Sequence, residues 1–141
     1  MDVLGYTSNG DIRIDLDGMT LFVPDNMGDA HRRLIAEWEA SGNTIPPYVP
    51  PLPTVDDYKL AIVSMLDAKA QERRYDSAVS ISTYVGSTNA QWAAEAQAYV
   101  AWRDAVWAYT YAELDKVLSG QRPQPTVEAF LGELPTMVWP A

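Results

Sequence analysis

The stretch from about residue 89 to residue 119 constrains this chain most, because it contains neither proline nor glycine and is rich in alanine. Alanine is the strongest helix former, whereas proline and glycine are the weakest. The pattern predicts one helix of about 30 residues, roughly 45 Å long. Such a helix is longer than most helices of globular proteins. We therefore expect it to dominate the fold.

The apolar residues of this helix lie on two faces. Trp92, Tyr99 and Val106 belong to one stripe, while Trp102 and Tyr109 fall on a second. Aromatic side chains bury about 150–250 Å² each, and one antiparallel helix cannot cover both faces. Two coverings stay open for the second face: either the N-terminal sheet and the proline-rich segment lie over it, or another protein chain does.

A proline-rich segment separates this helical part from the N-terminal part. Five prolines fall within residues 46–53, where they hold φ at about −65° and remove backbone donors. We expect an extended, semi-rigid linker. The chain then divides into an N-terminal module at residues 1–45, a linker at 46–53 and a C-terminal helical domain at 54–141.

The N-terminal module is predicted to be a small antiparallel sheet with one helix. Residues 11–17 alternate between charged and aliphatic, which is the period of a half-buried strand. The Asp17-Gly18 pair then supplies the positive φ angles of a two-residue hairpin turn into a second strand at 19–23. Residues 3–7 form a candidate third strand, and a short helix follows over about residues 29–40.

Helix start and stop signals divide the C-terminal half into further elements. Thr54 is the predicted N-cap of a helix that ends near residues 73–74. A short helix or loop is expected over residues 75–85, and a final short helix over 126–133. The apolar tail at 134–140 is expected to dock on the core or on a partner. The predicted fold class is α+β: a small N-terminal sheet, a proline-rich strap and a helical hairpin with one long helix.

The composition excludes several classes of function. The chain has no cysteine and one histidine, so it cannot perform cysteine chemistry and lacks the ligands of a zinc site. Its net charge of −9, without clustered lysine and arginine, argues against a nucleic-acid partner. No stretch approaches the ~18 apolar residues that cross a bilayer, and the chain opens without the basic segment of a secretory signal. We expect no cofactor, no membrane partner and folding in a cytoplasm.

Candidate catalytic and metal-binding residues are sparse. His31 lies beside two arginines, and we interpret it as a solvated surface residue. Residues 15–18 resemble a fragment of a calcium loop, but they lack the glutamate that an EF-hand requires. Glu95 and Asp104 lie nine positions apart on the long helix, and general acid–base catalysis by this pair is disfavoured. We predict no catalytic residue, no metal ligand and no enzymatic activity.

A protein interface is the functional feature that the residues favour. Tryptophan, tyrosine and arginine are enriched at interface hot spots, and proline-containing apolar segments suit docking into grooves. The candidates come from the long helix, the linker and the tail. They are Trp102, Arg103, Tyr109, Tyr48 and Trp139.

Two stretches resemble small tail and tail-fibre-associated proteins of tailed bacteriophages and prophages. In the first, residues 23–48, a VPD turn leads to a helix that ends in W-x-x-x-G-N-x-I and then to a proline-rich strap. In the second, residues 74–77, Tyr84 and residues 94–107 are similar to the C-terminal helical region of the same proteins. Together the two stretches place the resemblance over about residues 10–140.

The resemblance implies a non-enzymatic tail component, or a tail-fibre assembly chaperone that leaves before the particle is complete. The chain lacks a second arginine after Trp102-Arg103, where a Y-R-x-x-L-R type motif is usual in the chaperone-like proteins. We therefore expect a structural or adaptor protein of the virion tail, made in the host cytoplasm. Its implied partners are fibre, baseplate or tail-tube proteins and copies of itself, as a homo-oligomer or ring. A tail-associated glycan-binding or glycan-hydrolysing protein is the further alternative.

Overall fold

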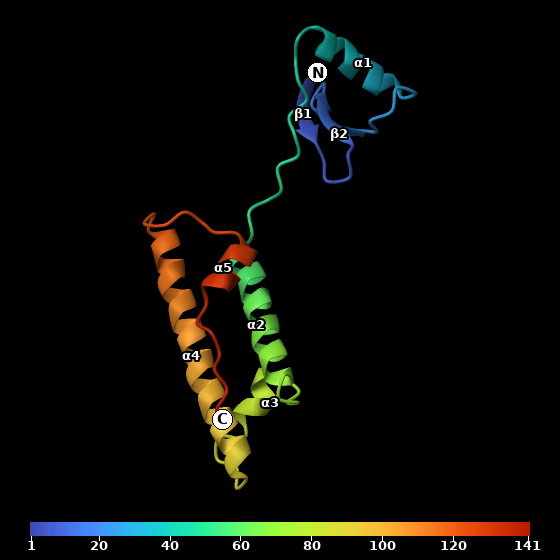
Figure 1. The fold of residues 1–141 in the computed structure, drawn as a ribbon. Coiled ribbons are helices and arrows are strands. Elements are labelled where there is room, and N and C mark those ends of the chain that lie inside the picture. Colours follow the sequence, from blue (N-terminus) through green and yellow to red (C-terminus); the bar gives the residue numbers. More distant parts are fainter. The chain divides into compact units, whose positions relative to one another are not determined.

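A three-stranded antiparallel sheet and five helices make up the chain, so the predicted α+β class is confirmed. The structure is a computed structural model that describes residues 1–141 (Figure 1). Two units, Met1–Leu52 and Pro53–Ala141, each have their own core. The division between them falls inside the proline-rich segment 46–53.

The N-terminal unit begins with the sheet, in the order β1 (Asp2–Tyr6), β2 (Ile12–Leu16) and β3 (Met19–Val23). The turn between β2 and β3 has Asp17 at φ 54° and Gly18 at φ 80°. Positive φ at both central residues is the signature of the turn that matches the twist of a hairpin. The hairpin and the third strand are therefore as predicted.

Helix α1 (Ala30–Ala40) packs on one face of this sheet. Its N-cap is Asp29, whose side chain accepts hydrogen bonds from the backbone N–H groups of His31 and Arg32. The buried side chains of this unit are all aliphatic, as the alternating pattern requires. They are Ile12, Ile14, Val23, Ile35 and Ile45.

The segment after α1 returns to strand β1. The backbone N–H of Tyr6 donates to the carbonyl oxygen of Pro46 at 2.9 Å. Gly5 has φ 120°, and a Cβ on this residue would lie 2.9 Å from the same oxygen. Glycine is required here because a side chain would collide with the backbone of the linker.

The helical unit consists of α2 (Val55–Gln71), α3 (Ala78–Ser82), α4 (Ala90–Leu118) and α5 (Val127–Glu133). The long helix spans 29 residues, as the absence of proline and glycine predicts. Every helix of this unit begins at a polar side chain that accepts hydrogen bonds from the first turn. These caps are Thr54, Ser77, Asn89 and Thr126.

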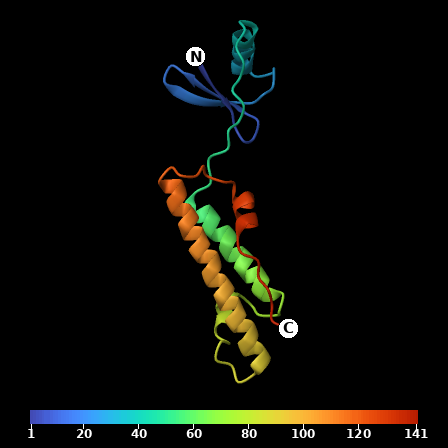
Figure 2. The ribbon, with the colours of Figure 1, turned by 60° about the vertical axis from the view of Figure 1, so that its left-hand side comes forward.

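The C-terminal tail covers the second apolar face of α4. It runs alongside both α2 and α4 (Figures 1 and 2) and buries Leu134 and Met137. The indole of Trp102 is only 8% exposed and donates from Nε1 to the carbonyl oxygen of Pro135 at 2.7 Å. The expectation that the sheet, the linker or another chain covers Trp102 is therefore wrong, because the tail of the same unit does so.

Tyr99 lies at the centre of this core and is fully buried. Its hydroxyl donates to the carbonyl oxygen of Leu66 at 2.6 Å, which joins α4 to α2. The rings of Trp102 and Trp139 pack against it with centroids 5.4 and 6.2 Å away. Burial raises the pKa of Tyr99 to about 12, so the hydroxyl keeps the proton that it donates.

We expect Trp102→Ala to lower the free energy of unfolding by about 3–5 kcal/mol, because it opens a cavity in the core. Trp92→Ala is the matched control on the same helix, since that side chain is 48% exposed. It should cost about 1 kcal/mol, the worth of an edge-to-face aromatic contact. Urea denaturation of the full chain, followed by circular dichroism, measures both. Equal losses would contradict the burial of Trp102 beneath the tail.

Candidate functional site

An open groove of about 360 Å³ lies between α2 and α4. We call it the α2–α4 groove. Most of its lining is apolar, and its volume is within the range of protein binding sites. The side chains that define it are Val55, Tyr58 and Ile62 of α2, Trp107, Tyr111, Leu114, Val117 and Leu118 of α4, and Phe130 of α5.

Phe130 forms the base of the groove. It packs edge-on against Tyr58, with centroids 5.9 Å apart, and parallel to Tyr109 at 6.0 Å. The rims of the groove are open, because Tyr111 is 61% exposed and Leu118 is 74% exposed. The chain therefore presents an apolar floor with large hydrophobic side chains along its edge.

The spacing of residues on α4 explains this edge. Trp107, Tyr111, Leu114 and Leu118 follow one another at intervals of four, three and four residues, which places them on one face of a helix. Sequence reasoning assigned the second apolar face to Trp102 and missed this stripe. The spacing of these residues is visible in the sequence. The sequence does not indicate, however, which apolar face of the helix the tail covers.

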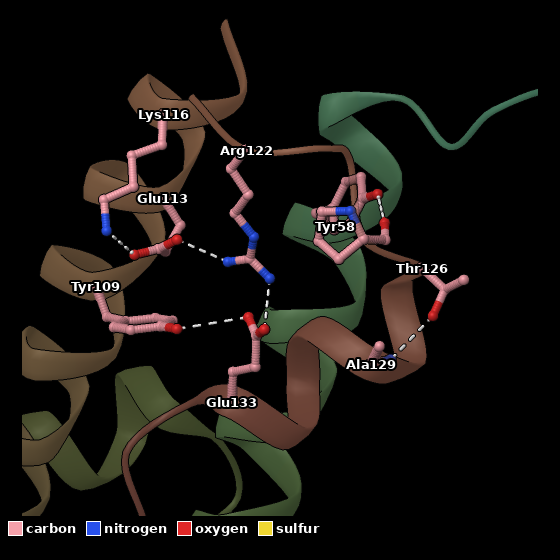
Figure 3. A network of polar contacts seen from close by, with 9 residues as sticks. Tyr58, Tyr109, Glu113, Lys116, Arg122, Thr126, Ala129 and Glu133 are labelled. Carbon is pink, nitrogen blue, oxygen red and sulfur yellow. Dashed lines mark hydrogen bonds and ion pairs between the residues drawn. The ribbon is translucent and has the colours of Figure 1, made fainter. Parts of the chain in front are cut away.

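A network of charged side chains contributes to the lining of the groove through Glu113 and Arg122 (Figure 3). Glu113 is buried and accepts hydrogen bonds from Lys116 Nζ at 2.8 Å and Arg122 Nη1 at 2.7 Å. Arg122 also pairs with Glu133 of α5. The hydroxyl of Tyr109 donates to the carboxylate of Glu133 at 3.4 Å. This network joins α4, the loop that follows it and α5 into one wall.

The charges in this network compensate one another. A buried carboxylate is unfavourable unless cations and hydrogen bonds satisfy it. The hydrogen bond from Lys116, followed by the bond from Arg122, holds the pKa of Glu113 below its usual value. The Glu113 carboxyl is therefore ionised at neutral pH. Its ion pair with Arg122 holds the loop that follows α4.

A second set of hydrogen bonds fixes the loop against α2. The hydroxyl of Tyr58 donates to the carbonyl oxygen of Pro125 (Figure 3). The side-chain amide of Gln124 donates to the carbonyl oxygen of Pro53 at 2.7 Å and to the Tyr58 hydroxyl at 3.1 Å. The groove is thus bounded by ordered backbone at the start of α2.

Trp102 and Tyr109, two of the predicted interface residues, make their contacts within the chain. The exposed position expected for Trp102 is wrong, because its indole lies under the tail. Tyr109 is half-buried, with its ring stacked on Phe130 and its hydroxyl bonded to Glu133. Packing of α5 and the tail against α4 explains both placements.

Arg103, Trp139 and Tyr48, the other predicted interface residues, lie in three different settings. Arg103 is half-buried and pairs with Asp104 at 2.8 Å. Trp139 is half-buried and packs on Tyr99 beside the buried Trp102, so the structure brings these two predicted residues together at the edge of the core. Tyr48 belongs to the N-terminal unit and is 42% exposed.

The candidate catalytic residues have structural partners. The His31 side chain is 44% exposed and lies 3.7 Å from Asp29. Asp15 accepts the backbone N–H of Gly18 at 2.9 Å, as a hairpin turn requires. Glu95 is buried and accepts from Gln91, whereas Asp104 is exposed.

Three general findings bear on the class of function. No group of three or more His, Cys, Asp or Glu side chains is arranged to hold a metal ion. No helix combines the length and the apolar character needed to cross a membrane. No protein-family model, no curated protein and no solved structure matches this chain.

We expect acid to destabilise the helical unit through Glu113. Its folded-state pKa lies below the ordinary value of 4.5, so its contribution is present above that value and is lost as the pH falls through the folded-state pKa. Glu113→Gln should flatten this part of the pH dependence of the unfolding free energy. Urea denaturation between about pH 6 and pH 3 measures it.

Asp104→Asn is the matched control, because it removes an exposed carboxylate outside the network. At pH values below the ordinary pKa of glutamate, the unfolding free energy of this control should fall with pH as steeply as that of the parent chain. The same slope in the parent chain and in Glu113→Gln would contradict the role of this carboxylate.

Proposed function

We propose that this chain is a non-enzymatic adaptor of a bacteriophage tail, which binds a segment of a neighbouring tail protein in the α2–α4 groove. The open apolar groove supports the adaptor role. The resemblance of residues 23–48 and 74–107 to tail-associated proteins supports the phage setting. The virion tail is the proposed location, with fibre, baseplate or tail-tube proteins as partners.

The shape and chemistry of the groove favour a helix as the bound segment. Its walls are the beginning of α2 and the last turns of α4, and an amphipathic helix places apolar side chains in such grooves at intervals of three and four residues. Trp107 and Tyr111 are residues of the type that supply most of the binding energy at interfaces. The charged residues that line the groove are Lys59, Glu113 and Arg122. Because Glu113 and Arg122 pair with each other, we expect the contact with the partner helix to be mainly apolar.

An adaptor needs a second contact surface, and the N-terminal unit offers one. Only one face of its sheet is covered by α1. Phe22 is 62% exposed and lies opposite Arg13 in the register of β2 and β3. Aromatic residues are enriched at interface hot spots, so Phe22 is the candidate anchor on this open face. The proline-rich segment then connects two units that each carry such a surface.

Mass spectrometry of purified virions tests the proposed location. We expect the chain at a fixed ratio to the other tail proteins. If it is expressed during infection but missing from the particle, the adaptor proposal is wrong and the assembly-chaperone alternative takes its place. The number of copies per particle, obtained from this ratio, would indicate the size of a homo-oligomer or ring.

We expect Leu118→Asp to weaken binding of the partner tail protein at least tenfold, because it places a charge on the apolar rim. A loss of that size corresponds to about 1.4 kcal/mol. Leu118 is 74% exposed, so the variant should fold. Isothermal titration calorimetry with the purified fibre protein, followed by the other tail proteins, measures the affinity.

Leu60→Asp is the matched control, since Leu60 is 67% exposed on α2 but does not line the groove. It should bind like the parent chain. Unchanged binding in both variants, or equal losses in both, would count against the groove as the contact surface.

A further inference from the structure

A second pocket, of about 420 Å³, lies where the end of α2 meets the beginning of α4. We call it the aromatic pocket. It differs from the α2–α4 groove because aromatic rings and charged or amide side chains share its wall. The residues on which the argument depends are Arg74, Tyr75, Tyr84, Gln91, Trp92 and Glu95.

Three aromatic rings form one side of this pocket. Tyr75 and Tyr84 pack edge to face with centroids 5.3 Å apart, and Tyr84 and Trp92 do so at 5.8 Å. Trp92 is nevertheless 48% exposed. Edge-to-face packing fixes the relative orientation of the rings. The indole of Trp92 is therefore oriented by its neighbours and keeps accessible surface in the wall of the pocket.

Glu95 brings a carboxylate to the same pocket. The residue is only 4% exposed and makes no ion pair. Its Oε1 accepts a hydrogen bond from the side-chain amide of Gln91 at 3.0 Å. Burial raises the pKa of the neighbouring Tyr75, and the charge of Glu95 and a hydrogen bond with it raise this pKa further. A carboxylate has about four acceptor sites, so Glu95 keeps acceptor capacity for the hydroxyl groups of a ligand.

Arg74 holds a backbone conformation that favours glycine. Its φ is 68°, at the position after a helix where glycine is the usual residue. The surrounding bonds impose this geometry, because Tyr75 N–H donates to the Ala70 carbonyl and Arg74 N–H donates to the Gln71 carbonyl. Strained residues cluster at binding sites. The strain is explained if the guanidinium is needed in the pocket.

The charges of the pocket favour a neutral ligand. Two arginines and two glutamates line it, so their formal charges cancel. Arg73 lies over the ring of Trp139 at 5.2 Å, and Glu72 pairs with Lys69 at 2.9 Å, so both are already engaged. The remaining charged and amide groups of the pocket are the guanidinium of Arg74, which forms no ion pair, and the Gln91 amide and Glu95 carboxylate, which share one hydrogen bond. A cation would meet the guanidinium and an anion would meet the carboxylate.

We propose that the aromatic pocket binds a neutral saccharide ring. The apolar C–H face of the sugar stacks on Trp92, its hydroxyl groups donate to Glu95, and Arg74 and Gln91 donate to its oxygens. A pyranose presents the apolar face and the adjoining hydroxyls that this set of side chains complements. This binding activity is separate from the adaptor role, and either one can fail without the other.

Titration of the full chain with N-acetylglucosamine, glucose and galactose tests the proposal, with the indole N–H signal of Trp92 followed by NMR. We expect a saturable shift from at least one sugar, with a dissociation constant of about 1–10 mM. Choline and inorganic phosphate serve as charged probes and should give no saturable shift. The absence of saturation by every sugar up to about 100 mM, or saturation by choline or phosphate instead, would overturn the proposal.

Arg74→Gly separates binding from folding. Glycine relieves the backbone at this position, so the variant should melt at a higher temperature than the parent chain and bind the sugar at least fivefold more weakly. A higher melting temperature with unchanged affinity would contradict the contact of Arg74 with the sugar and overturn the site as proposed.

Trp92→Ala tests the stacking plane independently, with Tyr111→Ala as its control because Tyr111 is an exposed aromatic residue outside the pocket. Calorimetry should detect no sugar binding by the first variant and parent-like binding by the second. Parent-like binding by both would overturn the stacking role of Trp92 and the proposal with it.

Discussion

The docking of the C-terminal tail on α4 is the contact on which the helical unit depends. Leu134 and Met137 enter the space beside α4, and the Trp102 indole donates to the backbone of Pro135. This hydrogen bond satisfies a carbonyl that the extended tail would otherwise bury without a partner. The long helix therefore obtains its second covering layer from residues more than 30 positions away. Because the tail buries Trp102, no neighbouring chain is needed to cover this residue.

The same docking leaves another face of α4 open. With Trp102 covered, the apolar stripe through Tyr111 and Leu118 is a part of the helix that the unit leaves exposed. Phe130 of α5 forms the base of the groove, and the ion pairs of Glu113 and Arg122 hold the neighbouring loop in place. A docking surface of this kind combines a rigid floor with exposed anchor residues, which suits capture of a helix.

The two ends of the helical unit differ in chemistry. The groove beside α5 is largely apolar, and two of its charged lining residues, Glu113 and Arg122, pair with each other. The aromatic pocket at the beginning of α4 keeps a buried glutamate without an ion pair and an arginine in a strained backbone conformation. The proposed binding of a protein at one end and that of a neutral polar ligand at the other are based on this difference.

Local sequence determined the elements and where they begin and end. The Asp17-Gly18 turn and the caps at Thr54, Asn89 and Thr126 act within a few residues, so the hairpin and helix starts are readable from the chain. Only tertiary structure decided which aromatic residues are core and which are available. Trp102 and Tyr111 are both large aromatic residues on one helix. Trp102 is buried and Tyr111 is exposed, because the tail, which is distant in sequence, packs on the first and not on the second. Helical periodicity marks the faces, but long-range packing selects the one to be buried.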